Sequence, residues 1–206
     1  MFRTSRLIAT VLLCAAAVAA QDLKPVPLPK PQTEGGRPLM QVLKERKTMR
    51  EFSPEKLSPQ VLSNLLWAAF GINREDGRRT APSAMNRQEI EIYVFMADGA
   101  YRYDAKANQL EPVVKDDLRA ATGSQDFVGQ APLNLVYVAD LAKQTSADMA
   151  YADTGFIAQN VYLYCASEGL ATVVRGTVPR DPVAKALKLR PDQRITLGQT
   201  VGYPKK

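Results

Sequence analysis

Two arginines four residues apart are the first side chains in this sequence whose types and spacing could do chemistry. Arg46 and Arg50 lie in the stretch 46–52, Arg-Lys-Thr-Met-Arg-Glu-Phe, which follows apolar residues at 39–43 and ends before Pro54. The three- and four-residue spacing of these positions predicts a helix that continues towards Pro54. A helix would bring the two Cβ atoms to about 5–6 Å on one face, where like charges repel each other. The pair is therefore either a solvated basic face or half of an anion-binding site.

Residue types that the sequence lacks exclude several kinds of catalytic site. The 206 residues contain no histidine, which excludes Ser-His-Asp and Cys-His catalysis and most catalytic zinc sites. After the first 20 residues the single cysteine is Cys165, within an apolar helical pattern that favours packing and leaves no intrachain disulfide. We therefore expect no metal site, and redox or acid–base chemistry would need a cofactor to supply the reactive atom.

Residues 1–20 are typical of a Sec-type signal peptide. They contain Arg3 and Arg6, an apolar run over 7–18 and small residues before Gln21. The apolar run is shorter than a membrane span usually requires. We expect cleavage, no stable membrane span afterwards, and an exported protein that is periplasmic or secreted. An uncleaved N-terminal anchor is the alternative.

The remaining chain divides into a linker and one domain. Residues 21–36 alternate proline with lysine and apolar residues, a composition that favours an extended tether without a core. Residues 37–206 are long enough for one well-packed domain. Without residues 1–20 the chain has 25 basic and 21 acidic residues, a net charge of +4 that is not gathered into one run. This pattern does not favour a nucleic-acid partner.

The elements that must position the arginines follow from apolar periodicity. Ser58 and Pro59 begin a helix that Gly71 ends, and a longer helix is predicted over 147–168. Apolar residues on most faces of the longer helix predict a place in the core or in a subunit interface. Shorter helices are expected at 116–122 and 181–187, and strands at 90–96, around Tyr101 and Tyr103, and at 110–113, 133–139, 171–174 and 195–201. The fold class is α+β, with a mixed, largely antiparallel sheet flanked by helices.

Together, four passages resemble the FMN-dependent nitroreductase family. They are the stretch 46–52, Ala-Pro-Ser-Ala-Met-Asn-Arg-Gln at 81–88, the long helix with the residues after it over 155–172, and Val-Gly-Tyr-Pro-Lys at 201–205. Their order and spacing cover almost the whole predicted domain. The short form with the hairpin around Tyr101 and Tyr103 is most similar to the subgroup that includes the dehydrogenase subunits of azole-forming synthetases.

The resemblance implies an FMN site and assigns roles to individual residues. It places Arg46 on the phosphate, Thr48 on the phosphate or ribityl oxygens, and Arg50 near N1 and the C2 carbonyl of the ring. Gly176 matches the position whose backbone N–H faces N5, so Gly176 and Arg50 are the predicted catalytic residues. The full set of predicted cofactor contacts is Arg46, Lys47, Thr48, Arg50, Pro82, Ser83, Asn86, Val174, Arg175, Gly176, Lys205 and Lys206.

Several of these residues have a structural alternative. Ser83 and Asn86 could instead cap a turn, and Gly176 could simply be part of one. Arg175 could be solvated, and the two terminal lysines could have no fixed partner.

The resemblance also implies a function. It implies a homodimeric oxidoreductase that passes a hydride from NAD(P)H or another donor through flavin N5 to a nitroaromatic, a quinone or a similar acceptor. Two other functions stay open, namely a flavin-binding or partner-binding protein without turnover and a flavin-dependent substrate dehydrogenase.

Overall fold

A seven-stranded sheet forms the centre of the computed structural model, which describes residues 24–206. The predicted signal peptide at 1–20 therefore lies outside the described residues. The strand order is β1-β4-β3-β2-β5-β7-β6, and every pairing in it is antiparallel. The strands are β1 (Val26–Pro27), β2 (Ile90–Met96), β3 (Gly99–Asp104), β4 (Gln109–Val114), β5 (Leu133–Asp140), β6 (Ala171–Arg175) and β7 (Gln193–Gly202). The predicted α+β class with a largely antiparallel sheet is confirmed.

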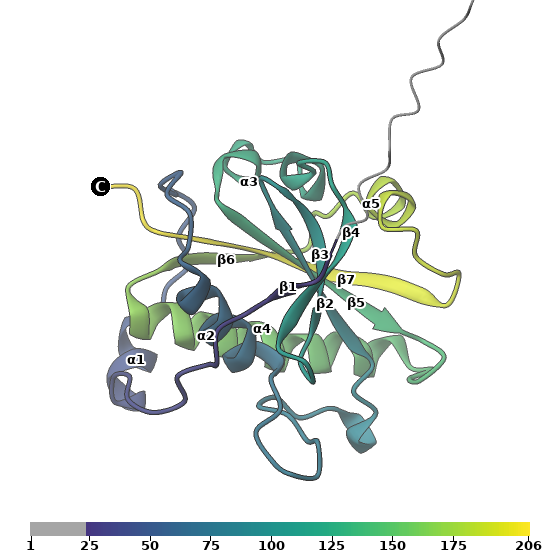
Figure 1. Cartoon of the computed structure of the whole chain (residues 1–206), viewed down its shortest axis with the longest axis horizontal. Coiled ribbons are helices and arrows are strands. Elements are labelled where there is room, and N and C mark those ends of the chain that lie inside the picture. Colours follow the sequence, from purple (N-terminus) through teal and green to yellow (C-terminus); the bar gives the residue numbers. More distant parts are fainter. Residues whose placement is uncertain (1–23) are drawn as a thin grey trace, which may run out of the picture.

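Helices cover both faces of the sheet. They are α1 (Leu39–Glu45), α2 (Pro59–Phe70), α3 (Asp126–Gln130), α4 (Ala147–Glu168) and α5 (Arg180–Ala186), with short 3-10 turns η1 (Ala84–Asn86) and η2 (Arg119–Thr122). In Figure 1, α1, α2 and α4 lie on one side of the sheet, and α3 and α5 lie on the other. Leu66 of α2 and Ile157 of α4 belong to the larger apolar core, while Val183 of α5 belongs to a second core on the opposite face.

Strand β5 is an interior strand buried on both faces, as predicted. It pairs with β2 on one side and β7 on the other, and all eight of its residues are buried. A strand covered on both faces reads as an almost continuous apolar run, which is the pattern of its sequence.

Both long helices begin and end where the sequence predicts. Ser58 Oγ accepts the backbone N–H of Val61 at 3.2 Å and begins α2, and Ser146 Oγ accepts that of Met149 at 3.3 Å and begins α4. Gly169, with a φ of +71°, ends α4 in the left-handed conformation that glycine adopts without strain.

Helix α4 buries only one face. Ile157 and Val161 are fully buried against the sheet, while Met149, Tyr151 and Phe156 are 47%, 37% and 49% exposed. Of the two predicted places for this helix, the core therefore accounts for one face and leaves apolar side chains on the other. None of the helices within 24–206 has both the length and the apolarity to cross a bilayer.

Helix α1 is shorter than predicted, and this changes the geometry of the arginine pair. It ends at Glu45, because Arg46 takes an extended conformation with φ −53° and ψ 121°. The chain then runs along the edge of β6, where Met49 N–H donates to the carbonyl of Thr172 at 3.0 Å. An edge strand offers unpaired carbonyls, and pairing with them replaces the helical hydrogen bonds. Arg46 and Arg50 therefore do not share a helical face, and that prediction is wrong.

The predicted tether is docked over the part that the structure describes. Val26 and Pro27 form β1 and extend the sheet beyond β4, and Leu28 N–H donates to the carbonyl of Asn108 at 3.0 Å. The Asn108 amide in turn donates to the carbonyl of Pro29 at 2.8 Å. Proline lacks an N–H but keeps its carbonyl, so an edge position suits it. Residues 24–36 therefore belong to the folded domain.

Two short segments also differ from the predictions. The helix expected over 116–122 is only the 3-10 turn η2, and the five-residue helix α3 at Asp126–Gln130 was not predicted. Five residues are too few to show a helical period in the sequence. These two pieces matter because they cover the buried end of β6.

Candidate functional site

Tyr162 of α4 joins three of the predicted site residues. Its hydroxyl accepts the backbone N–H of Val174 at 3.1 Å and lies 3.0 Å from Thr48 Oγ1. The guanidinium of Arg46 sits over its ring, 5.1 Å from the centroid, at cation–π distance. The extended segment after α1 places Thr48 there, and the alternation of β6 turns Val174 towards α4. The helix, the strand and the segment therefore meet at one side chain.

The cations of this region have no carboxylate of their own. Over residues 24–206, no Asp or Glu lies within ion-pair distance of Arg46, Lys47 or Arg50. The C-terminal tail reaches the same edge, because Lys205 N–H donates to the carbonyl of Glu51 at 3.2 Å. Arg46, Lys47, Arg50, Lys205 and Lys206, which we call the cation cluster, are thus carried by two neighbouring segments. Guanidinium, ammonium and hydroxyl donors are the groups that bind a phosphate.

A pocket of about 530 Å³ opens beside this cluster, between α1, α4 and β6. Lys47, Tyr162 and Thr172 are among the residues that line it. Glu45, Met49 and Leu170 line it as well, so its walls combine a cation and hydroxyl groups with a carboxylate and apolar surface.

Gly176 lies one residue beyond β6 and is exposed. A Cβ built on this glycine would meet no heavy atom within 4 Å. The space beside this backbone is therefore open, and the approach of the flavin ring to Gly176 stays a prediction.

Arg175 faces away from the cation cluster. Its guanidinium donates to the Thr122 carbonyl at 2.7 Å, Thr200 Oγ1 at 3.0 Å and Asn134 Oδ1 at 3.3 Å, and the residue is only 3% exposed. Burial lowers the pKa of Arg175 to about 10, so the group stays charged at neutral pH. Side chains alternate along a strand, and Val174 already points towards α4. The predicted solvated or cofactor-binding side chain is therefore a buried hydrogen-bonded one.

The loop 82–88 carries Pro82, Ser83 and Asn86. Ser83 Oγ accepts the backbone N–H of Gln88 at 2.9 Å, and Asn86 Oδ1 accepts from Gln88 Nε2 at 3.0 Å. Both side chains thus stabilise the turn, as the structural alternative has it, while the Ser83 hydroxyl hydrogen and the Asn86 amide N–H groups stay free to donate. Met85, Asn86 and Gln88 have φ values of 55°, 53° and 48°. Such values are uncommon outside glycine, so the surroundings must hold this loop in place.

The loop and the cation cluster lie at different ends of α4. The loop is tied to Asp153, whose Oδ2 accepts Ala84 N–H at 2.8 Å, whereas the cluster meets the helix at Tyr162. Nine helical residues correspond to about 13 Å. The structure therefore brings Arg46 and Thr48 together at Tyr162 but keeps Ser83 and Asn86 apart from them. An elongated ligand, or a site completed by a second chain, would use both groups.

Sequence reasoning missed two side chains of this region. Tyr162 lies in the quoted helix passage but had no assigned role. A polar tyrosine in an apolar pattern, opposite a strand, was the available signal. Glu89 is fully buried, and neither of its carboxyl oxygens has a hydrogen-bond partner in the described part of the chain. A glutamate directly before an apolar strand was the signal there.

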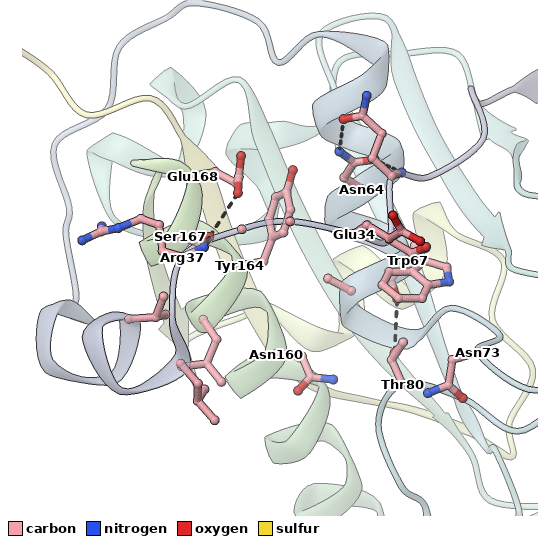
Figure 2. A pocket seen from close by; sticks show the side chains of 18 residues that line it. Glu34, Arg37, Asn64, Trp67, Asn73, Thr80, Asn160, Tyr164, Ser167 and Glu168 are labelled. Carbon is pink, nitrogen blue, oxygen red and sulfur yellow. Dashed lines mark hydrogen bonds between the residues drawn. The ribbon is translucent and has the colours of Figure 1, made fainter.

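A second pocket lies between the segment 32–37, α2 and α4 (Figure 2). Its volume is about 570 Å³, and Trp67, Asn160 and Tyr164 are among its lining residues. Thr80 Oγ1 donates to the Trp67 carbonyl at 3.1 Å across one wall. None of the predicted cofactor contacts lines this pocket, so it is separate from the predicted flavin site.

Solved structures share this architecture. A nitroreductase-type protein of Ralstonia eutropha JMP134 is 43% identical, with a TM-score of 0.83 over 88% of this chain and 90% of that one. A structure from Desulfovibrio desulfuricans, solved in complex with FMN, is 21% identical with a TM-score of 0.62 over 84% of this chain and 89% of that one. A chain of the E. coli microcin synthetase complex, solved with truncated pro-MccB17 bound, is also 21% identical, with a TM-score of 0.66 over 98% of this chain and 85% of that one. At this lower identity the likeness shows the fold.

The sequence comparisons agree with the structural ones. A protein of Methanocaldococcus jannaschii that carries the name of a nitroreductase is 33% identical over 171 residues, 74% of this chain and 85% of that protein. The family model described as "Nitroreductase family" matches residues 43–203, which span α1 to the C-terminal tail. The resemblance seen in the four sequence passages is thereby confirmed, and the chain belongs to the nitroreductase family.

Proposed function

We propose that this protein is an FMN-dependent oxidoreductase that moves a hydride from NAD(P)H or another donor to a nitroaromatic, a quinone or a similar acceptor. The observation that carries the proposal is the cation cluster beside Tyr162, at the strand that leads to Gly176. Family membership supports an oxidoreductase, and the FMN complex of a fold neighbour supports the flavin.

The residues present fit the polar half of FMN. Arg46 and Lys47 would bind the phosphate dianion, with Lys205 and Lys206 approaching from the tail. Charge-assisted hydrogen bonds of this kind are about twice as strong as neutral ones. Thr48 lies between the cations and Tyr162, within 3.0 Å of the tyrosine hydroxyl, and its hydroxyl would donate to a phosphate or ribityl oxygen.

The residues around Gly176 fit the ring half. When bound, FMN supplies the hydride-carrying chemistry that no side chain of this protein offers. The open space at Gly176 would let its backbone N–H reach the ring. Arg50 would stabilise negative charge at the ring's N1–C2 edge, and Ser83 and Asn86 would donate to its polar atoms.

Exposed apolar residues support the proposed homodimer. Leu39 and Met40 of α1 are 60% and 76% exposed, and Phe156 of α4 is 49% exposed. Apolar surface on neighbouring elements marks an interaction face. A second copy packed there would bring the loop 82–88 of one chain nearer to the cation cluster of the other.

The flavin is tested first. The purified protein should carry a flavin absorbance band or bind added FMN, and Arg46→Ala should weaken that binding. Arg78→Ala is the matched control, because within residues 24–206 the Arg78 side chain pairs only with Asp76, at the surface. A protein that neither retains flavin nor binds added FMN would overturn the proposal.

Turnover is tested separately by anaerobic titration. Bleaching of bound flavin by NADH or NADPH, followed by reoxidation by an acceptor, supports the oxidoreductase. Flavin that no donor reduces indicates a binding protein. Reduction by an organic substrate alone indicates a substrate dehydrogenase. The fold likeness to a chain of the microcin synthetase complex is the reason to test this alternative.

We also propose that the protein is exported, on the strength of the signal-like pattern at 1–20. Fractionation of expressing cells, with the mass of the recovered chain, tests this. A chain recovered from the cytoplasm with residues 1–20 intact would contradict it.

A further inference from the structure

Glu89 is the most unusual ionisable residue outside the proposed flavin contacts. It lies directly before β2, is fully buried, and neither Oε atom has a hydrogen-bond partner among residues 24–206. A buried carboxylate without a partner is costly, and such a group usually takes up a proton instead. Its protonated form would carry an O–H donor that needs an acceptor.

Asp153 offers that acceptor from α4. Asp153 is 2% exposed, and its Oδ2 already accepts Ala84 N–H from the loop 82–88. Burial, and then the neighbouring Asp153 carboxylate, raise the pKa of Glu89 to about 7. Two neighbouring buried carboxyl groups seldom ionise together, so a proton on Glu89 relieves the repulsion between them.

We propose that Glu89 is a positioning residue: its protonated carboxyl donates to Asp153, and the shared proton holds the loop 82–88 in its strained conformation. When Glu89 loses that proton, two buried carboxylates repel each other and Asp153 loosens its hold on Ala84. The loop then relaxes away from the positive φ values at Met85, Asn86 and Gln88. Its effect on flavin rests on the proposed function, since Ser83 and Asn86 are the loop's predicted ring contacts.

The other charges near Glu89 leave this pairing in place. Lys143, from the connection between β5 and α4, is a cation that lowers the pKa of Glu89, but less than burial raises it. Three charged residues on adjoining segments have other partners: Asp140 pairs with Arg190 at 3.0 Å, Arg87 donates to the Lys143 carbonyl at 2.6 Å, and Arg79 donates to Gln88 Oε1 at 2.8 Å.

Carboxyl NMR on the unmodified full chain tests the proton directly. With ¹³C-labelled Glu and Asp, the Glu89 signal should titrate near pH 7 and the Asp153 signal should shift at the same pH. Glu89→Gln assigns the signal by removing it. A Glu89 signal that titrates below about pH 5, as an ordinary glutamate does, would overturn the proposal.

The loop is tested at the Ala84 amide. Its ¹H–¹⁵N signal should move with the same midpoint as Glu89, and Glu89→Gln, which keeps a donor for Asp153, should abolish that movement. Asp153→Asn should shift the Glu89 titration to lower pH, because it removes the like charge. Asp148→Asn, exposed on the same helix, is the control and should leave both signals unchanged. If the Ala84 amide signal does not move as Glu89 titrates, the proposed link between Glu89 and the loop is wrong.

The consequence for flavin has its own readout. The FMN dissociation constant should rise several-fold as the pH passes through about 7, and the Glu89→Gln profile should be flat. If the protein binds no flavin, the proposed function fails, while the carboxyl and amide titrations still decide the proton-sharing pair. If Glu89→Gln does not fold, the titrations of the unmodified chain and of Asp153→Asn still decide it.

Discussion

At the scale of single residues, the candidate site depends on side chains that touch more than one element. Tyr162 contacts Arg46, Thr48 and the backbone of Val174, and these belong to an extended segment and to a strand. Arg175 follows Val174 in β6. It likewise connects several elements, on the opposite face of the sheet. Neighbouring residues of one short strand thus stabilise different layers.

Replacing Tyr162 by Phe should cost stability and flavin affinity together. The change removes the hydroxyl that accepts Val174 N–H and leaves a half-buried donor unpaired, which costs about 1–2 kcal/mol of unfolding free energy. Chemical denaturation and FMN titration measure the two effects. Tyr151→Phe, on the exposed face of the same helix, should change neither. Equal effects from the two variants would contradict the role of the Tyr162 hydroxyl.

Arg46 and Arg50 should separate in their effects on the flavin. Arg46→Ala should chiefly weaken FMN binding, about tenfold or more, because it removes a charge-assisted phosphate contact. Arg50→Ala should chiefly lower the flavin reduction potential, because it removes a cation from the ring. Equilibrium titration and potentiometry distinguish these outcomes. Identical changes in both variants would count against the division of roles.

Glu89 gives the protein's stability a pH dependence of defined sign. Its folded pKa of about 7 lies above the ordinary value of an unfolded glutamate. The folded state therefore binds more protons between the two values, and the unfolding free energy falls as the pH rises from about 5 to about 7. Urea denaturation across this range measures the slope. The slope should be smaller in Glu89→Gln, and an equal slope in that variant would assign it to other groups.

At the scale of elements, the end of β6 at Gly176 is exposed, and no other part of the described chain fills the space beside its Cα. Gly176→Ala should leave the fold unchanged, because a Cβ there meets no heavy atom within 4 Å. The same methyl group would stand where the flavin ring is expected, so FMN binding should weaken. Thermal melting and flavin titration report the two properties. Unchanged flavin affinity would place the ring elsewhere.

The elements also show what the sequence could and could not predict. Helices α2 and α4 were predictable because a capping serine begins each one and a glycine ends it. The end of α1 was not, because the chain after Arg46 leaves the helix and Met49 pairs with Thr172 at the edge of β6, a contact distant in sequence. Arg175 was misjudged for a similar reason, since its partners Thr122 and Asn134 come from separate elements.

At the scale of the whole molecule, β1 forms one edge of the sheet and the segment after α1 pairs with the other. Strand β1 adds to β4 at one edge, and at the other Met49 pairs with Thr172 of β6 while residues 51–53 pair with the C-terminal tail. Proline at one edge and lysines at the other also discourage pairing with another sheet. The predicted tether is thus part of the fold.

Deleting residues 24–36 should destabilise the domain. The deletion removes β1 and the hydrogen bonds from Asn108 to Pro29, and uncovers the edge of β4. The expected loss is on the order of 1–3 kcal/mol, with a greater tendency to aggregate. A chain beginning at residue 24 is the control in denaturation and light-scattering measurements. If the two chains are equally stable, residues 24–36 act as a linker and do not contribute to the folded domain.

The position of β7 has a consequence for the order in which the protein is made. Strands β5 and β6 do not pair with each other, and each pairs with β7, the last strand in the sequence. During synthesis β6 therefore has no partner strand until Gln193–Gly202 has emerged from the ribosome. If the N-terminal segment directs export, as proposed, the export machinery would receive the chain before its sheet is complete.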